Sequence, residues 1–278
     1  MRLLVCSLED GASVNIRDRL TEIAEWQERG SFEGRPVLRR GHDVLVTIEG
    51  RHLFADDIDR RVREATGLDL DCVVFLSRHR AASGIPTLTV HPIGNFGEKA
   101  DYGGRPGTLV PSAPDLMTSL LRSMQGHASG LGYQISFEVT HHGPYLSTPT
   151  LYLEIGSSES QWPDVKAGEA LASSLLEVEV LKSTKVIGLG GGHYAPRFSE
   201  VALRKKVSIG HMIANHFADD APDDQLVMAI RKALAASEGA GLVYIHKKSM
   251  PRSRATHIKE LVRELGADVI DSSGLEDL

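Results

Sequence analysis

Short runs of apolar and β-branched residues recur along the whole chain and predict buried β-strands. The predicted strands are Leu3 to Leu8, Val44 to Ile48, Cys72 to Leu76, Thr87 to His91, Tyr133 to Thr140, Thr150 to Ile155, Lys185 to Leu189, Val207 to His211, Leu242 to His246 and Asp268 to Ile270. Segments whose apolar residues recur every three or four positions lie between several of these runs and predict helices. The predicted helices are Asp56 to Thr66, Pro114 to Met124, Val165 to Leu181, Gln225 to Ala236 and Thr256 to Leu265.

The alternation of strands and helices predicts the fold class. It favours an α/β protein of three layers, α/β/α, in which helices cover both faces of a mixed, mostly parallel sheet. The last unit is especially clear, because the helix ends before Gly266, a typical helix-terminating glycine, and a short strand follows. A chain of 278 residues can form one large domain or two smaller ones. We expect a single α/β hydrolase domain over residues 1–278.

The composition is that of an ordinary globular protein, with 41% hydrophobic and 24% charged residues. No apolar stretch approaches the roughly 20 residues that cross a bilayer, and the short apolar start of the chain lacks the hydrophobic region of a signal peptide. We therefore expect a cytoplasmic protein with no membrane partner. The two cysteines, Cys6 and Cys72, lie in apolar runs and offer no C-x-x-C spacing, which excludes a disulfide scaffold and disfavours a thiolate zinc site.

Charge is unevenly distributed along the chain. The formal net charge of −6 argues against a protein that simply coats nucleic acid. The stretch from Lys247 to Arg263, however, holds six basic residues and only one acid, Glu260, and Arg204 to Lys206 form a second basic cluster. Such runs are most often solvated faces. A basic tract with interspersed hydroxyl residues also suits contacts with phosphate groups.

Histidines lie next to glycine or proline in the sequence at three predicted strand ends. His91 precedes Pro92-Ile93-Gly94, the pair His141-His142 precedes Gly143-Pro144, and His193 follows Gly190-Gly191-Gly192. Imidazole binds metals and transfers protons near neutral pH, and residues at strand ends can be aimed into one cleft. These histidines therefore predict a functional site. Histidines outside such contexts, His42, His52 and His127, are expected to be ordinary packed or surface residues.

Two glutamates extend this predicted site. Glu138 and His142 lie four residues apart and therefore share one face of a strand, and Glu154 interrupts an otherwise apolar strand. Adjacent histidines in a strand point to opposite faces, so His141 and His142 can bind one ion only where the strand breaks, as Gly143-Pro144 indicates. His79 follows another strand and could converge with the same group. Zinc accepts histidine and carboxylate ligands, although no compact zinc signature such as HExxH is present.

Two glycine-containing segments lie near the predicted site. The N–H groups of Gly191 and Gly192 can form a concavity for an oxyanion or a phosphate. This motif is neither a Walker loop nor a dinucleotide fingerprint, because it runs into His193, Tyr194 and Pro196 in place of opening a helix. Residues 92–112 contain five glycines and three prolines and predict a long, ordered, functional loop.

Several of these motifs together resemble the archaeal and plant type of D-aminoacyl-tRNA deacylase. The motifs are Thr140-His141-His142-Gly143-Pro144, Leu153-Glu154-Ile155-Gly156-Ser157 with Trp162, and Gly190-Gly191-Gly192-His193-Tyr194-Ala195-Pro196, supported by His91-Pro92-Ile93-Gly94-Asn95 and Ile209-Gly210-His211. The resemblance implies hydrolysis of the ester between a D-amino acid and the 3′-terminal ribose of tRNA. It also implies zinc dependence and a core similar to the phosphorylase/hydrolase-like fold and to bacterial peptidyl-tRNA hydrolase.

Ester hydrolysis needs an activated water and donors for the oxyanion, and each requirement has candidate residues. The expected catalytic residues are His142, Glu138, His193, Gly191 and Gly192. The expected metal ligands are His91, His141, His142, His193 and Glu154, with zinc as the metal. The expected contacts to tRNA phosphates are Lys247, Lys248, Arg252, Arg254 and Lys259. D-aminoacyl-tRNA is the expected partner, and a monomer is the working expectation for the oligomeric state.

Two other functions are compatible with the same residues. A zinc-dependent hydrolase of small molecules, such as an aminopeptidase or amidohydrolase, would use the same histidines without needing the basic tract. A noncatalytic RNA-binding protein would use the histidines and glycines only to contact phosphate. Turnover of D-aminoacyl-tRNA, and its dependence on the basic tract, separate the three functions.

Overall fold

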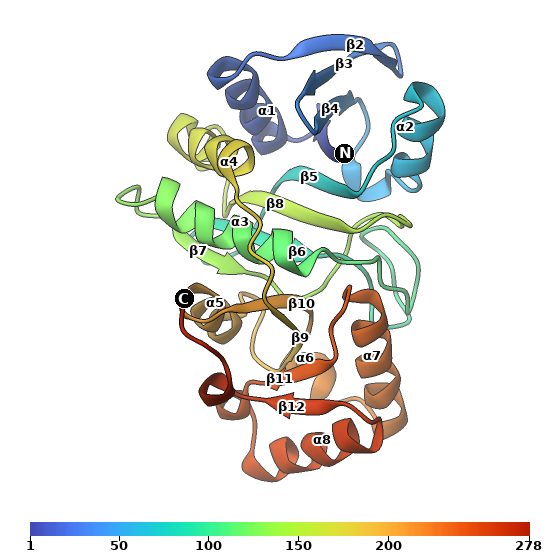
Figure 1. Ribbon diagram of the computed structural model, residues 1–278, viewed down its shortest axis with the longest axis vertical. Helices are drawn as coiled ribbons and strands as arrows, with labels where there is room; N and C mark the ends of the chain where they lie inside the picture. The colour runs from blue at the N-terminus through green and yellow to red at the C-terminus, as the bar shows by residue number, and fades with distance from the viewer.

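The strands of the computed structural model, which describes residues 1–278, form two sheets (Figure 1). The larger sheet has the order β2-β3-β4-β1-β5-β8-β6-β7, and the smaller has the order β10-β9-β11-β12. The strands of the larger sheet are β1 (Arg2–Ser7), β2 (Gln27–Phe32), β3 (Arg35–Arg40), β4 (Asp43–Ile48), β5 (Cys72–Arg78), β6 (Thr87–Pro92), β7 (Gln134–Phe137) and β8 (Thr150–Gly156). Those of the smaller sheet are β9 (Thr184–Leu189), β10 (Val207–Ile213), β11 (Leu242–Ile245) and β12 (Asp268–Ile270).

Most strand pairs are parallel. The smaller sheet is parallel throughout, and in the larger sheet β4, β1, β5 and β8 run parallel to one another. The antiparallel pairs are β2 with β3, β3 with β4, and β6 with β8. The predicted α/β class with mixed, mostly parallel strands is confirmed, with the strands divided between two sheets.

Helices pack on these sheets. They are α1 (Gly11–Ile23), α2 (Ile58–Thr66), α3 (Pro114–His127), α4 (Val165–Glu177), α5 (Pro196–Arg204), α6 (Asn215–Ala218), α7 (Asp223–Ala236) and α8 (Arg252–Glu264), with short 3-10 turns at His52–Phe54, Lys247–Ser249 and Ser272–Gly274. In Figure 1, α1, α4, α3 and α5 lie to the left, and α2 and α7 to the right. None of the helices is both long enough and apolar enough to span a membrane.

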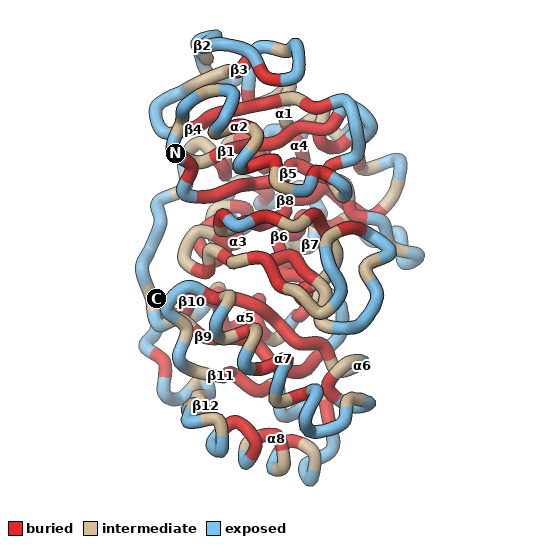
Figure 2. The backbone as a smooth tube through the Cα atoms, turned by 90° about the vertical axis from the view of Figure 1, so that its right-hand side faces the viewer, coloured by how far each residue is buried: buried red, intermediate tan, exposed pale blue.

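The core extends through both sheets. One cluster of 38 buried residues includes Leu4 and Leu153 of the larger sheet together with Val186 and Ile209 of the smaller sheet. Figure 2 shows the central strands buried, whereas β2 at the far edge is exposed. The single-domain organisation remains a prediction.

One local prediction is wrong. The glycine-histidine motif was expected to run into Pro196 without opening a helix, but Pro196 is the first residue of α5. Proline is well tolerated there, because the first N–H groups of a helix have no intrahelical partner and the fixed φ of proline suits the first turn. Gly190–Ala195 is therefore a loop that joins a strand directly to a helix.

The segment that follows β7 links the two sheets. The predicted strand Tyr133 to Thr140 ends at Phe137 in the structure. The N–H of Val139 then donates to the carbonyl of His193 at 2.9 Å, and the N–H of Thr140 donates to the carbonyl of Met212 at 3.1 Å. Residues 138–142 consequently lie at the seam between the sheets, beside the carboxyl ends of β9 and β10.

Candidate functional site

The strand register brings the predicted site residues onto one face of the larger sheet. In the antiparallel pair of β6 and β8, His91 lies opposite Tyr152 and Thr89 lies opposite Glu154. In the parallel pair of β5 and β8, Ser77 lies beside Glu154. Side chains at paired positions point to the same face of a sheet, and so do side chains two residues apart on one strand. His91 and Glu154 are therefore diagonal neighbours on one face, and backbone pairing fixes them there.

Glu138 lies between three histidines. Phe137 pairs with Val90 in the parallel register of β6 and β7, which places the next residue, Glu138, beside His91. The Glu138 carboxylate lies 2.9 Å from His193 Nε2, 3.1 Å from His79 Nδ1 and 3.4 Å from His141 Nε2. Glu138 therefore brings together residues from three separate parts of the chain, 79, 138–141 and 193.

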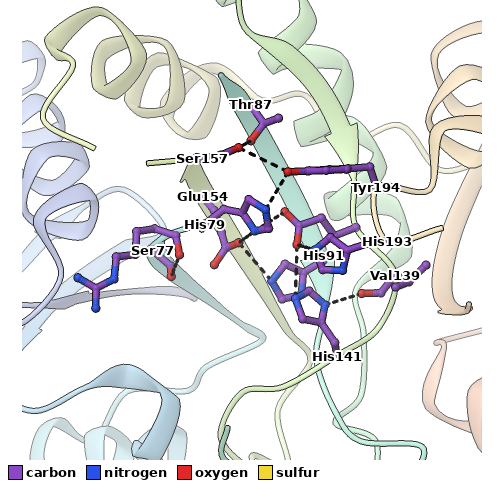
Figure 3. A network of polar contacts seen from close by, with 12 residues as sticks. Ser77, His79, Thr87, His91, Val139, His141, Glu154, Ser157, His193 and Tyr194 are labelled. Atoms are coloured by element: carbon purple, nitrogen blue, oxygen red, sulfur yellow. Dashed lines mark hydrogen bonds and ion pairs between the residues drawn. The ribbon is translucent and has the colours of Figure 1, made fainter. Parts of the chain in front are cut away.

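Glu154 makes a second set of contacts with the same group. Its carboxylate lies 3.6 Å from His79 Nδ1 and 3.6 Å from His91 Nε2. His79 thus lies between the two glutamates. Figure 3 shows the contacts of Glu154 with His79 and His91 as dashed lines.

The adjacent histidines His141 and His142 both belong to the site. The ring centroids of His91 and His141 are 4.2 Å apart, and those of His141 and His142 are 4.1 Å apart. The strand break expected after this pair is present, because His142 has φ +23° and Gly143 has φ +102°. This left-handed backbone lets neighbouring side chains share one side of the chain.

Burial and neighbouring charges together determine the protonation states of the glutamates and of His79. Burial would raise the pKa of fully buried Glu138, but contacts with His193 and His79 and the charge of His91 hold it well below its usual value. Burial likewise opposes the charged form of His79, yet the two glutamates raise its pKa to about 11. A protonated His79 and two ionised glutamates are therefore present at neutral pH.

The histidine pair at the strand break is neutral. Burial and the neighbouring charge of His91 lower the pKa of His142 to about 3. Burial and the neighbouring His142 and His91 hold the pKa of His141 well below its usual value. A neutral imidazole is the form that ligates a metal, so neither ring must lose a proton for binding.

The donor set fits a metal ion. Potential ligand atoms lie within 4.8 Å of one another in three groups: His91, His141 and His142; His79, Glu138 and His193; and His91, Glu138 and Glu154. Buried atoms without a hydrogen-bond partner include His91 Nε2, His142 Nδ1, both Glu138 carboxylate oxygens and Glu154 Oε2. Burying unpartnered polar atoms is costly, and a cation would satisfy these atoms at once.

The surrounding residues orient the rings. His141 Nδ1 lies 2.7 Å from the Val139 carbonyl and His91 Nδ1 lies 3.1 Å from the Pro92 carbonyl, so Nε2 of both rings is left for the centre. His79 Nε2 lies 3.0 Å from the Tyr194 hydroxyl. A Cβ at position 156 would lie 2.8 Å from the His79 Cβ, so the absence of a side chain at Gly156 leaves room for His79.

His52 is a site neighbour that the sequence did not indicate. It was expected to be an ordinary packed residue. It is buried, its Nε2 lies 2.8 Å from the Ser77 hydroxyl, and burial lowers its pKa to about 4. It lines a cavity of about 60 Å³ that also borders Asp10, His142 and Glu154. No local motif marks His52, because only the fold brings it here.

On its other side the centre opens into a larger cleft of about 400 Å³. This cleft is lined by His141 and His142, by residues of the 92–112 loop including Phe96 and Tyr102, and by Phe217 of α6. The loop that was expected to be functional therefore forms one wall of the cleft.

The glycine motif supplies one free backbone donor of the two predicted. The N–H of Gly191 donates to Asn215 Oδ1 at 2.8 Å and to Ser249 Oγ at 2.9 Å, so it is used within the fold. The N–H of Gly192 makes no hydrogen bond. His193, which follows, has an exposed side-chain fraction of 43% while its Nε2 contacts Glu138.

The basic residues are dispersed. Lys247 and Lys248 follow β11 and line a cleft of about 660 Å³ with Arg197. Arg254 donates to the Ala218 carbonyl and pairs with Asp223. Arg252 is exposed and Lys259 is half-buried on α8, and neither lines that cleft. Only the first two of the five predicted tRNA contacts border it.

Comparison with known proteins gives consistent matches over the whole chain. The profile of the family described as "D-aminoacyl-tRNA deacylase" matches residues 66–270. A D-aminoacyl-tRNA deacylase of Methanococcoides burtonii is 40% identical over 99% of this chain, which spans 57% of that relative's length. One of Methanosarcina barkeri is 37% identical, with 99% of this chain and 90% of the relative covered. A crystal structure described as a conserved protein of unknown function superposes with a TM-score of 0.87 at 30% identity, covering 99% and 98% of the two chains.

Proposed function

The chain belongs to the D-aminoacyl-tRNA deacylase family, and we propose that its histidine–glutamate centre cleaves the ester between a D-amino acid and the 3′-terminal ribose of tRNA. One observation carries the proposal. Buried imidazole and carboxylate atoms without hydrogen-bond partners converge from separate strand ends beside a cleft that substrate can enter. Such convergence of titratable groups on a cleft is typical of a catalytic centre.

His91, His141 and His142 are the proposed zinc ligands. Their nitrogen atoms lie within 4.8 Å of one another, and the two rings of lowered pKa are already neutral. Three histidines with an open position are a ligand set typical of catalytic zinc. The Lewis acidity of zinc would make a water molecule easier to deprotonate near neutral pH. The Pro92 carbonyl, 3.1 Å from His91 Nδ1, holds that ring in place and leaves Nε2 for the metal.

His193 is the proposed general base. The Glu138 carboxylate lies 2.9 Å from His193 Nε2, and in the proposed mechanism Nε2 carries the ring proton while Nδ1 accepts a proton. As the water oxygen attacks the ester carbonyl, Nδ1 takes the water proton. The tetrahedral intermediate then expels the ribose oxygen, which receives that proton.

Two further groups support this reaction. The free N–H of Gly192 is the proposed donor to the oxyanion, because it adjoins His193 and makes no other hydrogen bond. His79, whose pKa is raised to about 11 by the two glutamates, keeps Glu138 ionised and positioned.

The experiment measures release of the amino acid from D-tyrosyl-tRNA and L-tyrosyl-tRNA by zinc-loaded protein. Wild type should release the D-amino acid, while His142→Ala and His193→Ala should lose at least about 100-fold in kcat with tRNA affinity retained. His127→Ala is the matched control, because His127 ends α3 and pairs with Glu177 outside the centre. Absence of turnover by metal-loaded wild type would instead favour a noncatalytic RNA-binding protein.

The cleft beside Lys247 and Lys248 is the proposed contact for the tRNA backbone. The strand order of the smaller sheet places a topological switch point between β9 and β11, where open α/β sheets bind ligands at the carboxyl ends of their strands. Lys247, Lys248 and Arg197 line this crevice. Lys247 forms a solvent-exposed ion pair with Asp271, and Arg197 forms a partly exposed one with Glu200, so both can exchange these partners for phosphate contacts.

Neutralising this crevice separates a tRNA enzyme from a small-molecule hydrolase. Lys247→Ala with Lys248→Ala should raise KM for D-aminoacyl-tRNA and weaken the dependence of KM on salt concentration. Lys206→Ala is the control, because this exposed lysine pairs with Glu276 away from the crevice. An unchanged KM in the double variant would favour the small-molecule hydrolase.

A further inference from the structure

The centre communicates with two cavities of very different size. The cavity beside His52 and Asp10 holds about 60 Å³. Since a water molecule occupies roughly 30 Å³ in the liquid, this space suits about two waters and no larger group. The cleft of about 400 Å³ on the other side reaches the same His142 and also His141. Of the two cavities, only the larger cleft can admit a bulky part of a substrate to these histidines.

One wall of this cleft is fastened to the catalytic segment. The N–H of Gly94 donates to the carbonyl of His142 at 3.0 Å, and the N–H of Gly143 donates to the carbonyl of Tyr102 at 3.2 Å. Asn95 Nδ2 donates to the carbonyl of Gly103 at 3.0 Å, which closes the loop on itself. The backbone at Tyr102 is therefore held at a fixed position relative to His142.

Two glycines allow this close attachment. Gly103 and Gly104 have φ +92° and +77°, and a Cβ on Gly103 would overlap the carbonyl oxygen of Leu53. A Cβ on Gly104 would lie 2.6 Å from the carbonyl oxygen of Gly143. The loop thus has no room for side chains where it meets the site, and its shape is set before substrate arrives.

Tyr102 is the exception in this closely packed loop. Its backbone is anchored, yet 67% of the residue is exposed, and its ring lines the cleft without an aromatic or hydrogen-bond partner. Phe96 and Phe217 line the same cleft with ring centroids 5.6 Å apart. An exposed aromatic ring on a preorganised backbone is a suitable surface for stacking a flat group.

We propose that this cleft binds the terminal adenosine of tRNA, with the adenine base stacked on Tyr102. The inference rests on the proposed function, because the scissile ester is attached to the ribose of that nucleoside. Amino-acid side chains vary in size, whereas the terminal nucleoside is the same in every tRNA, and a rigid platform suits the invariant group. Lys99 and His216 line the cleft as donors for the adjoining phosphate, and Asp101 supplies an acceptor for the exocyclic amine of adenine.

Steady-state kinetics with D-tyrosyl-tRNA and D-alanyl-tRNA test the stacking. Tyr102→Ala should raise KM about 5- to 150-fold for both substrates, the range that corresponds to about 1–3 kcal/mol per stacked base, with kcat little changed. Tyr102→Phe should retain the wild-type KM, because the ring is preserved. Phe54→Ala removes another exposed aromatic ring that does not line the cleft and should leave KM unchanged.

A binding experiment assigns the effect to the nucleoside. The affinities of wild type and Tyr102→Ala are measured for uncharged tRNA and for the same tRNA without its terminal adenosine. Removing the adenosine should weaken binding to wild type at least as much as Tyr102→Ala does, and should weaken binding to Tyr102→Ala by a smaller factor than binding to wild type, because the stacking contribution is already lost in the variant. Equal losses in both proteins would overturn the proposal.

The two proposals fail separately. If wild type did not deacylate D-aminoacyl-tRNA, the proposed function would fail, while the binding cycle would still show whether the cleft holds adenosine. If Tyr102→Ala raised KM for D-tyrosyl-tRNA but not for D-alanyl-tRNA, the cleft would hold the amino-acid side chain, and the adenosine subsite would be overturned. Unchanged thermal unfolding of Tyr102→Ala verifies that the variant is folded.

Discussion

The backbone at His142 and Gly143 decides whether two adjacent histidines can serve one centre. A regular strand would send His141 and His142 to opposite faces, and the left-handed conformation of His142 and Gly143 prevents this. The sequence indicated a break at Gly143-Pro144, because glycine and proline both disfavour a continued strand. It did not indicate that Glu138 contacts His141 and not His142, since that depends on where β7 ends.

Substitution of Gly143 should show the importance of this break. Gly143→Ala places a Cβ about 3.0 Å from Ile93 Cβ at φ +102°, so we expect a loss of about 1–3 kcal/mol in the free energy of unfolding, together with weaker metal binding. Gly132→Ala is the matched control, because Gly132 also has positive φ, +80°, but no neighbouring atom within 4 Å. Urea denaturation measures both, and an equal loss in the two variants would mean that packing against Ile93 contributes nothing.

A buried histidine outside the centre should make stability depend on pH. His211 lies between the Thr140 hydroxyl and the Val110 carbonyl, and burial lowers its pKa to about 4 from about 6.5. Between these pH values the unfolded chain binds a proton that the folded protein excludes. The stabilisation is therefore complete above pH 6.5 and is lost as pH falls toward 4, by up to about 3 kcal/mol.

The His211→Gln variant isolates this contribution. Its free energy of unfolding should fall less between pH 7 and pH 5 than that of wild type, as measured by urea denaturation at each pH. His257→Gln, which removes an exposed histidine paired with Asp223, should retain the wild-type slope. Parallel slopes for wild type and His211→Gln would contradict the assignment.

At the scale of elements, the strands were easier to predict than the helices. Buried strands such as β1 and β5 are continuous apolar runs, whose signal does not depend on neighbours. The hairpin of β2 and β3 was missed because only Phe32 and Val37 of its strand residues are buried, and the strands show no apolar alternation. Helix α1 was missed for a similar reason, although Asp10 caps it by accepting from the Ser13 N–H at 3.0 Å.

The loop between β9 and α5 illustrates how an element positions a catalytic side chain. Asn215 and Ser249, from the ends of two other parallel strands, both accept from the Gly191 N–H and thereby fix the residues before His193. Removing both side chains would leave this part-buried N–H without a partner.

We expect the Asn215→Ala, Ser249→Ala double variant to lose about 1–3 kcal/mol in stability and at least about tenfold in kcat, since His193 is no longer held against Glu138. Each single variant retains one acceptor and should lose much less. Deacylation kinetics and urea denaturation of the three variants measure this non-additivity. Additive single effects would show that the two acceptors do not share one role.

At the scale of the whole molecule, the centre is assembled from segments far apart in the sequence. Three histidine-rich motifs could be recognised because each carries its own glycine or proline signal. His79 was recognised from its place after a predicted strand, whereas His52 and the platform at Tyr102 carry no comparable local signal and become visible only when strand order and loop attachment are known.

Metal binding should therefore stabilise the whole fold. Zinc that binds only the folded protein adds about 2.7 kcal/mol at a free concentration 100 times its Kd, and chelation removes this contribution. We expect zinc to raise the thermal unfolding midpoint of wild type and of the His127→Ala control, and to leave that of His142→Ala nearly unchanged. Calorimetric scans with zinc and with chelator provide the measurement, and equal shifts in all three proteins would place the metal elsewhere.

Hydrogen exchange at the seam between the sheets can report, without any substrate, whether the centre is intact. The N–H groups of Val139 and Thr140, which follow β7 of the larger sheet, donate hydrogen bonds to the carbonyls of His193 and Met212 on the side of the smaller sheet. Any separation of the two halves of the molecule must expose these two protons to solvent at the moment that Glu138 and His193 part. Their deuterium uptake thus reports how often the centre opens, and zinc should slow that uptake more than it slows exchange at the outer edge strands.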